Sequence, residues 1–137
     1  MLDTVRLITD SGLVVLIWMV QLIVYPSFSH YPPEHLYKWH SVYTGRIAAI
    51  VIPLMFGQLI ATGIQVFLER DFYTISSSVL VAGVWISTFT QFVPLHHKIA
   101  ERQELKSSIN KLVTKNWVRT FLWSLLFLLS FYYRIIA

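Results

Sequence analysis

The sequence predicts an all-α fold, an integral membrane four-helix bundle that forms a single transmembrane domain over residues 1–137. Of the residues, 55% are hydrophobic and only 13% are charged, whereas soluble domains carry about 25% charged residues. The mean hydropathy is +0.59, and a soluble domain of this composition would expose large apolar patches. Four segments reach the length of about 20 mostly apolar residues that a membrane helix needs. They are residues 5–28, 33–68, 72–94 and 117–137.

The first two segments are separated by a proline-rich stretch, YPSFSHYPPEH. The chain begins with MLDTVRL, which lacks the basic start of a signal peptide, and no small-residue cleavage site follows. We therefore interpret residues 5–28 as a retained helix. Pro33 suits the first turn of the second helix, because the amide of that position has no partner within the helix anyway.

Two polar stretches separate the later segments. The short sequence ERDF predicts a tight turn, so the second and third helices should form an antiparallel hairpin. The longer stretch HHKIAERQELKSSINK has apolar residues at roughly helical spacing. We expect it to lie at the membrane surface and to extend the ends of the third and fourth helices. Ser107 or Ser108 should cap the fourth helix, because a serine oxygen can accept hydrogen bonds from first-turn amides.

Basic residues are concentrated in two of the expected connections. Lys38 follows the first segment. The connection after the third segment and the start of the fourth carry Lys98, Arg102, Lys106, Lys111, Lys115 and Arg119. Basic residues beside apolar spans mark the cytoplasmic side of a membrane protein. The sequence thus predicts a multi-pass protein of the cell inner (cytoplasmic) membrane with both termini outside the cytoplasm.

The composition excludes several classes of chemistry. The absence of cysteine excludes disulfides, thiolate metal sites and iron–sulfur clusters. No nucleophile–base–carboxylate triad, glycine-rich phosphate loop or HExxH motif occurs. The acidic residues expected at the polar end, Glu34, Glu101 and Glu104, lie outside the lipid-embedded parts of the spans, which in the second segment is 47–68, so a carboxylate-rich di-iron site lacks its ligands. The net charge of +4 reflects the residues that flank the spans, and no nucleic-acid partner is expected.

Polar residues from all four helices are expected to meet at the cytoplasmic end of the bundle. At 100° per residue, His40, Tyr43 and Arg46 form one sector of the second helix, and His96 follows Pro94 on the third. The other members are Gln21 and Tyr25 of the first helix and Asn116, Arg119 and Trp123 of the fourth. Aromatic rings here also fit an interfacial belt, and arginines can snorkel to the headgroups. So many polar groups at one end favour a pocket over anchoring alone.

The residue types in this pocket indicate binding or redox chemistry. His40 and His96 are candidate ligands of haem b or of a transition metal. Together with Tyr43 they are alternatively candidate catalytic groups that transfer protons. Arg46 and Arg119 are candidates for binding the anionic part of a ligand. The remaining ligand-binding candidates are Gln21, Tyr25, Asn116 and Trp123.

The motifs VQLIVYPSF, LYKWHSVYTGRI, VPLHHKIA and NWVRTFLWSL, in this order, resemble those of a widespread group of short four-helix bacterial membrane proteins. The resemblance covers most of the chain and implies a four-helix membrane protein without implying an activity. Members of the group often carry a further arginine after the NWxRT motif, where this chain has Leu125 and Leu126. A looser similarity, in size and number of spans only, runs to anthrone-oxygenase-like membrane proteins and to the haem-b protoporphyrinogen oxidases of bacteria.

From the sequence we therefore expect a membrane protein that binds haem, a metal or an aromatic or quinone-like amphiphile for redox chemistry. The alternative is a non-enzymatic accessory subunit or a protein that binds anionic lipid at its polar end. A transporter is less favoured, because four spans need an oligomer to line a path. The expected partners are membrane lipid, an amphiphilic small molecule, and further copies or subunits in a homo-oligomer or larger membrane complex.

Overall fold

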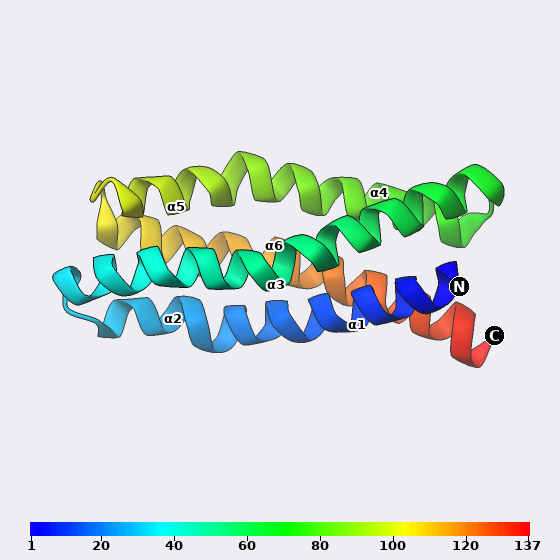
Figure 1. Cartoon of the computed structure of the whole chain (residues 1–137), viewed down its shortest axis with the longest axis horizontal. Helices are drawn as coiled ribbons and strands as arrows, with labels where there is room; N and C mark the ends of the chain where they lie inside the picture. The colour runs from blue at the N-terminus through cyan, green and yellow to red at the C-terminus, as the bar shows by residue number, and fades with distance from the viewer.

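The computed structural model describes residues 1–137 as four long helical rods packed side by side (Figure 1). The first rod consists of α1 (Leu2–Met19), the π-helical turn η1 (Val20–Val24), α2 (Tyr25–Ser27) and the 3₁₀ turn η2 (Phe28–His30). The second rod is α3 (Pro33–Leu68). The third consists of α4 (Phe72–Ser87), the π-helical turn η3 (Thr88–Phe92) and α5 (Val93–Ala100). The fourth consists of α6 (Leu105–Phe131) and the π-helical turn η4 (Tyr132–Ile136).

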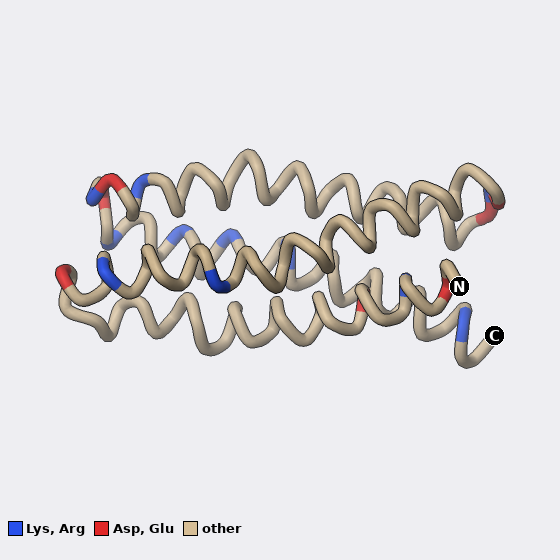
Figure 2. Tube along the Cα trace, in the orientation of Figure 1, with Lys and Arg blue, Asp and Glu red and all other residues tan.

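All four rods are long and apolar enough to cross a membrane, which confirms the predicted all-α fold and suggests a multi-pass membrane protein. Consecutive rods run in opposite directions, so both termini lie at one end of the bundle (Figure 1). We call this the terminal end and the opposite one the loop end. Lysine and arginine residues are concentrated toward the loop end (Figure 2). Large apolar side chains such as Phe67 and Phe72, 77% and 71% exposed, cover the outside of the bundle, as lipid contact requires.

Two of the rods contain a π-helical turn just before a proline. The backbone N–H groups of Tyr25 and Val93 each bond to the carbonyl five residues earlier. Pro26 and Pro94 follow directly. A proline ring clashes with the carbonyl four residues before it, and a wider turn accommodates the ring. The extra residue turns every later side chain by about 100° relative to an unbroken α-helix, and this decides which residues face the interior.

A capping box forms the tight turn between α3 and α4 at the terminal end. The Asp71 carboxylate accepts a hydrogen bond from the Thr74 backbone N–H at 2.8 Å. In return the Asp71 backbone N–H donates to Thr74 Oγ1 at 3.2 Å. Both bonds satisfy amides that a helix start leaves free. The expected antiparallel hairpin of α3 and α4 is therefore present.

The fourth helix begins earlier than the sequence analysis expected. Residues 101–104 separate α5 from α6, so Ser107 and Ser108 lie inside α6 and the expected serine cap is wrong. The N-cap residue is Glu104, whose side chain pairs with Lys98 at 3.1 Å and does not cap the helix. Arg102 and Glu104 have positive φ angles of 56° and 45°. Two left-handed residues reverse the chain sharply, so the helix restarts before the serines.

Candidate functional site

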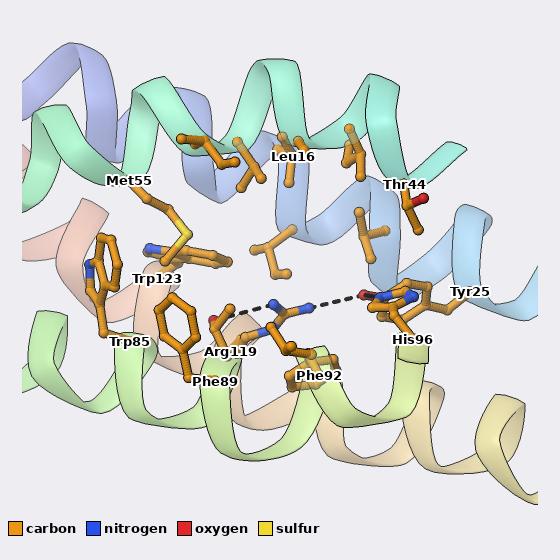
Figure 3. A pocket seen from close by; sticks show the side chains of 18 of the residues that line it. Leu16, Tyr25, Thr44, Met55, Trp85, Phe89, Phe92, His96, Arg119 and Trp123 are labelled. Atoms are coloured by element: carbon orange, nitrogen blue, oxygen red, sulfur yellow. Dashed lines mark hydrogen bonds between the residues drawn. The ribbon is translucent and has the colours of Figure 1, made fainter. Parts of the chain in front are cut away.

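A cavity of about 380 Å³ lies between α3 and the rod formed by α4, η3 and α5 (Figure 3). This volume falls in the range of about 300–1,000 Å³ that is typical of small-molecule sites. Of the 20 residues that line the cavity, 16 are hydrophobic. Aromatic rings form much of the wall: Tyr25, Tyr43, Phe56, Trp85, Phe89, Phe92 and Trp123. Such a lining suits a ligand with a flat apolar body.

The cavity opens through the side of the bundle. Four of its lining residues are about half exposed on the outer surface, namely Ile52 and Phe56 of α3, Phe89 of η3 and Val93 of α5. All four side chains are apolar and lie within the candidate membrane spans. In a membrane this surface faces lipid, so an apolar molecule can reach the cavity directly from the bilayer.

Arg119 of α6 is the only charged residue that lines the cavity, and it is 7% exposed. Its guanidinium donates to Asn116 Oδ1 from Nε (3.0 Å) and Nη2 (2.9 Å), and to the Tyr25 hydroxyl from Nη2 (3.1 Å). Nη1 has a longer contact of 3.4 Å with Thr88 Oγ1. The guanidinium carbon lies 3.5 Å from the centre of the Phe92 ring. Arg119 belongs to none of the ion pairs of the chain, so all the hydrogen-bond partners of its guanidinium are neutral.

Amide hydrogen bonds fix the position of Arg119. Asn116, nearly one turn earlier on α6, donates to Gln21 Oε1 at 3.0 Å, and the Thr120 hydroxyl donates to the same oxygen at 3.1 Å. Gln21 lies in η1, and its Nε2 donates to the carbonyl of Val113 at 3.0 Å. The amide groups of both side chains are thus bonded on their nitrogen and their oxygen. A buried network that is satisfied in this way is rigid, so Arg119 is presented to the cavity in one orientation.

Three side chains from three rods form a row beside Arg119. His40 Nε2 and His96 Nδ1 are 2.9 Å apart, and His96 Nε2 is 3.1 Å from the Tyr25 hydroxyl. The two imidazole rings stack with their centres 5.2 Å apart. Phe28 packs edge-on against His40 at 6.0 Å between ring centres. Each of the three polar groups can both donate and accept a hydrogen bond.

The structure brings together most of the residues that the sequence analysis singled out. Hydrogen bonds join one set, which we call the Arg119 network: Gln21, Tyr25, His40, His96, Asn116, Arg119 and Thr120. Tyr43 and Trp123 line the cavity beside this network. Arg46 differs from the expectation, because it is exposed on α3 and does not line the cavity. On an ideal helix Arg46 lies about 120° from His40, outside the face of α3 that packs into the bundle.

The two histidines do not have the geometry expected of metal or haem ligands. Both nitrogens of His96 are engaged, one by His40 and one by Tyr25. The imidazole rings lie too close together for a haem to fit between them as axial ligands. No group of three or more side chains that could hold a metal ion is present. The arrangement is better suited to proton transfer and to hydrogen bonding with a ligand.

A second buried polar cluster, toward the terminal end, was missed by the sequence analysis. Arg6 and Asp10, one turn apart on α1, are both 0% exposed and form an ion pair of 3.1 Å. Gln58 donates to Asp10 Oδ1 at 2.6 Å, and Arg6 donates to Gln65 Oε1 at 2.9 Å. The remaining members are Tyr73, Ser77 and Ser130. We call this set the Arg6–Asp10 network, and its members come from all four rods.

Both residues lie toward the terminal end, inside the bundle and not on its surface. The signal that identifies them is their spacing, since opposite charges four residues apart can pair on one helix face. Both also lie inside an apolar stretch, where an unpaired charge is strongly disfavoured.

No family model, curated protein or solved structure matches this chain. What the structure supports is a four-helix protein whose four long helices are apolar enough to span a membrane. The resemblance of its motifs to the group of short bacterial membrane proteins remains a resemblance.

Proposed function

We propose that the protein binds an aromatic or quinone-like amphiphile in the cavity, with the polar head of the ligand against Arg119. The observation that carries this proposal is the state of Arg119, a buried cation with neutral partners only, at the wall of an apolar cavity. An arginine in a bilayer costs about 2.5–3.5 kcal/mol on insertion scales. An anionic or carbonyl oxygen at this position would offset part of that cost, and no carboxylate of the chain does so.

The aromatic lining favours a flat ligand over a single acyl chain. Phe92 of η3 covers one face of the guanidinium, and the ring centre of Trp123 of α6 lies 5.8 Å from the guanidinium carbon (Figure 3). Phe56 and Phe89 stand at the opening. Rings placed in this way can stack on a planar body in offset or edge-on arrangements. The side opening lets such a molecule arrive from the bilayer.

Redox chemistry would enter with the ligand in this proposal. A quinone-like molecule carries its own redox centre, and the chain would supply binding, orientation and protons. Haem is the less suitable cofactor, because His40 and His96 bond to each other.

The alternative is a non-enzymatic protein that binds an anionic lipid by the same arginine. The headgroup phosphate would then meet Arg119 and an acyl chain would fill the cavity. The planar guanidinium suits a phosphate as well as a carboxylate, so the two ligand classes must be separated by experiment.

The binding test uses the full chain in nanodiscs of phosphatidylcholine and an alkyl hydroxynaphthoquinone as the probe. Quenching of tryptophan fluorescence reports binding, because Trp85 and Trp123 line the cavity. Arg119→Gln should weaken binding at least about tenfold, which is ~1.4 kcal/mol. Arg119→Lys should also bind weakly, since lysine lacks the planar fork that contacts Asn116 and Tyr25 together.

Arg46→Gln is the matched control, because Arg46 lies at the same end of the protein and is exposed. It should bind the quinone as the unchanged chain does. Equal affinity in Arg119→Gln and Arg46→Gln would contradict the proposal. Loss of quinone binding only in nanodiscs that contain phosphatidylglycerol would favour the lipid-binding alternative.

We also propose that the loop end faces the cytoplasm, because the basic residues are concentrated there. A reporter fused after Ala137 should then be active outside the cytoplasm, and one inserted near Glu104 should be active inside. The reverse pattern would place the Arg119 network at the outer face.

A further inference from the structure

We propose that His40, His96 and Tyr25 form a proton relay that connects the loop end of the bundle to the head of a ligand in the cavity. The inference rests on the proposed function, because it needs a ligand at Arg119. The two hydrogen bonds of the row, 2.9 Å and 3.1 Å, place three exchangeable groups in series. Imidazole and phenol each accept a proton on one side while they release one on another.

The two ends of the row have different surroundings. Tyr25 lines the cavity and accepts a hydrogen bond from Arg119 at 3.1 Å. His40 does not line the cavity, and it lies about 10 Å along α3 from Pro33 at 1.5 Å per residue. Within the chain His40 uses its Nε2 for His96, which leaves its Nδ1 as the outer end of the row. His40 is only 2% exposed, so the row starts beneath the surface of the loop end, where water must reach its Nδ1, and stops at the ligand.

Arg119 determines which hydrogen-bond directions are allowed at the inner end. A guanidinium can only donate, so the Tyr25 oxygen accepts from Arg119 and its proton can point either to His96 or to the cavity. In the first case every proton of the row points away from the ligand. In the second, His40 donates to His96, His96 donates to Tyr25, and Tyr25 can donate to a ligand oxygen.

The transfer conserves protons and leaves all three side chains neutral. Tyr25 gives its hydroxyl proton to an anionic oxygen of the ligand, and takes the Nε2 proton of His96. His96 takes the Nε2 proton of His40 on its Nδ1. His40 takes one proton from water on its own Nδ1. The net result is one new O–H bond on the ligand and one proton lost from the water at the loop end.

Few other titratable groups face this row. Tyr43 of α3 lies with its ring centre 6.5 Å from that of His40 and 6.4 Å from that of His96. Arg119 of α6 touches Tyr25, and the groups that η2 and η3 contribute nearby include the apolar rings Phe28 and Phe92. The carboxylates of Glu34 and Glu104 at this end are exposed and paired with Arg102 and Lys98. No carboxylate is hydrogen-bonded to the row, so the ligand is the anion that the row can protonate.

The test measures how fast a bound probe is protonated. The alkyl hydroxynaphthoquinone is suitable, because its anion and its neutral form absorb at different visible wavelengths. The full chain in phosphatidylcholine nanodiscs is loaded with the anion and mixed with acidic buffer in a stopped-flow instrument. His40→Phe should slow protonation of the bound probe at least about tenfold, in line with the contribution of a positioned proton donor. The rate is read at a saturating concentration of the probe, because His40 bonds to His96 of the cavity wall and its replacement also affects the affinity.

His40→Gln is the second variant, in case the loss of both nitrogens prevents folding. Glutamine can still donate a hydrogen bond to His96, yet an amide does not pass protons on, so the rate should fall as in His40→Phe. His35→Phe is the matched control, since His35 is an exposed histidine on the same helix, and it should leave the rate unchanged.

The outcomes separate the relay from the binding site. Saturable binding with a slow rate in both His40 variants supports the relay. Saturable binding with an unchanged rate in either variant overturns the relay and leaves the binding site in place. If the unchanged chain does not bind the probe at all, the proposed function fails and the relay falls with it.

Discussion

Arg6 and Arg119 are both buried arginines of the same bundle, but their surroundings differ in charge and in packing. Arg6 is paired with Asp10 and is surrounded by side chains from the other three rods. Arg119 has no acidic partner and borders a cavity. The charges of the Arg6–Asp10 network cancel, and side chains surround it on all sides. The Arg119 network carries a net positive charge and borders the cavity on one side.

Under the proposed function, the first network stabilises the fold and the second binds the ligand. Removing one partner of a buried ion pair leaves an uncompensated charge in the interior, which strongly destabilises the fold. A buried charge without a counter-ion is costly for the fold, so its presence beside a cavity favours a role in binding. The predictions that follow test this division, beginning with the largest expected effect.

Asp10→Ala should cause the largest loss of stability, because it leaves Arg6 charged and buried without its partner. Breaking a buried pair in this way typically costs about 3–5 kcal/mol. The measurement is thermal unfolding of the purified protein in detergent. The double variant Arg6→Met with Asp10→Leu should be less destabilised than Asp10→Ala, since it removes both charges together. If the double variant unfolds at a lower temperature than Asp10→Ala, the hydrogen bonds of this network contribute more to stability than the pairing of its charges.

Arg119→Ala should destabilise the fold less, by about 1–3 kcal/mol. The change leaves Asn116 Oδ1 without its donor and takes one donor from the Tyr25 hydroxyl, but it also removes an unpaired buried charge. Unfolding should therefore occur at a temperature between those of the unchanged chain and Asp10→Ala. A loss as large as that of Asp10→Ala would erase the distinction between the two networks.

Trp123→Phe should have a smaller effect of about 1–2 kcal/mol, because it deletes one hydrogen bond and keeps an aromatic ring. Trp123 is the residue that touches both networks. Its Nε1 donates to Gln58 at 3.2 Å, and its ring lies 5.8 Å from the Arg119 guanidinium carbon. In combination with Asp10→Ala the two losses should not add, since both act through Gln58. Strict additivity of the unfolding free energies would show that the networks are independent.

Removal of the Asp71 capping box should have the smallest effect on the free energy of unfolding, and this effect should depend on pH. The backbone hydrogen bond from Thr74 lowers the pKa of the Asp71 carboxyl from its ordinary value of 3.8. Because the pKa is lower in the folded chain, the cap stabilises the fold above pH 3.8 and this contribution is lost as the pH falls through the folded-state pKa. Asp71→Ala should cost about 1 kcal/mol at neutral pH. The difference in unfolding free energy between Asp71→Ala and the unchanged chain should shrink in acid. A difference that stays constant with pH would show that the cap does not need the negative charge of Asp71.

The number and approximate positions of the four long helices could be predicted from the sequence, because they depend on the composition of whole segments. Apolar length predicted the four spans, and the turn signals at Pro33 and ERDF predicted the bounds 33–68, which agree with α3. The start of α6 did not follow, because polar residues such as Lys106 and Ser107 are acceptable in a helix that leaves the membrane. The two residues with positive φ in the preceding turn are Arg102 and Glu104. Arginine and glutamate do not favour this conformation, so their sequence did not predict the turn.

The candidate site was predictable on rods with regular geometry and less so elsewhere. His40, Asn116 and Arg119 lie on unbroken α-helices, and the ideal wheel placed them well. The same wheel puts Trp18 beside Gln21 and Tyr25, whereas Trp18 is 40% exposed and packs against Trp117. The π-helical turn η1 follows Trp18, contains Gln21 and ends before Tyr25, and a helical wheel with a constant step does not account for its extra residue.

The length of α3 has a consequence for where a ligand of the proposed kind would first meet the protein. The helix has 36 residues and is about 54 Å long at 1.5 Å per residue, while the hydrocarbon layer is about 30 Å thick. A bilayer aligned with the terminal end reaches along α3 from Leu68 to about Ala48. His40 and Tyr43 then lie at headgroup depth, and the cavity extends from that depth into the acyl chains. Amphiphiles partition to this boundary with the head outward, so under the proposed function the bilayer itself would concentrate and orient them at the opening before the protein makes a contact.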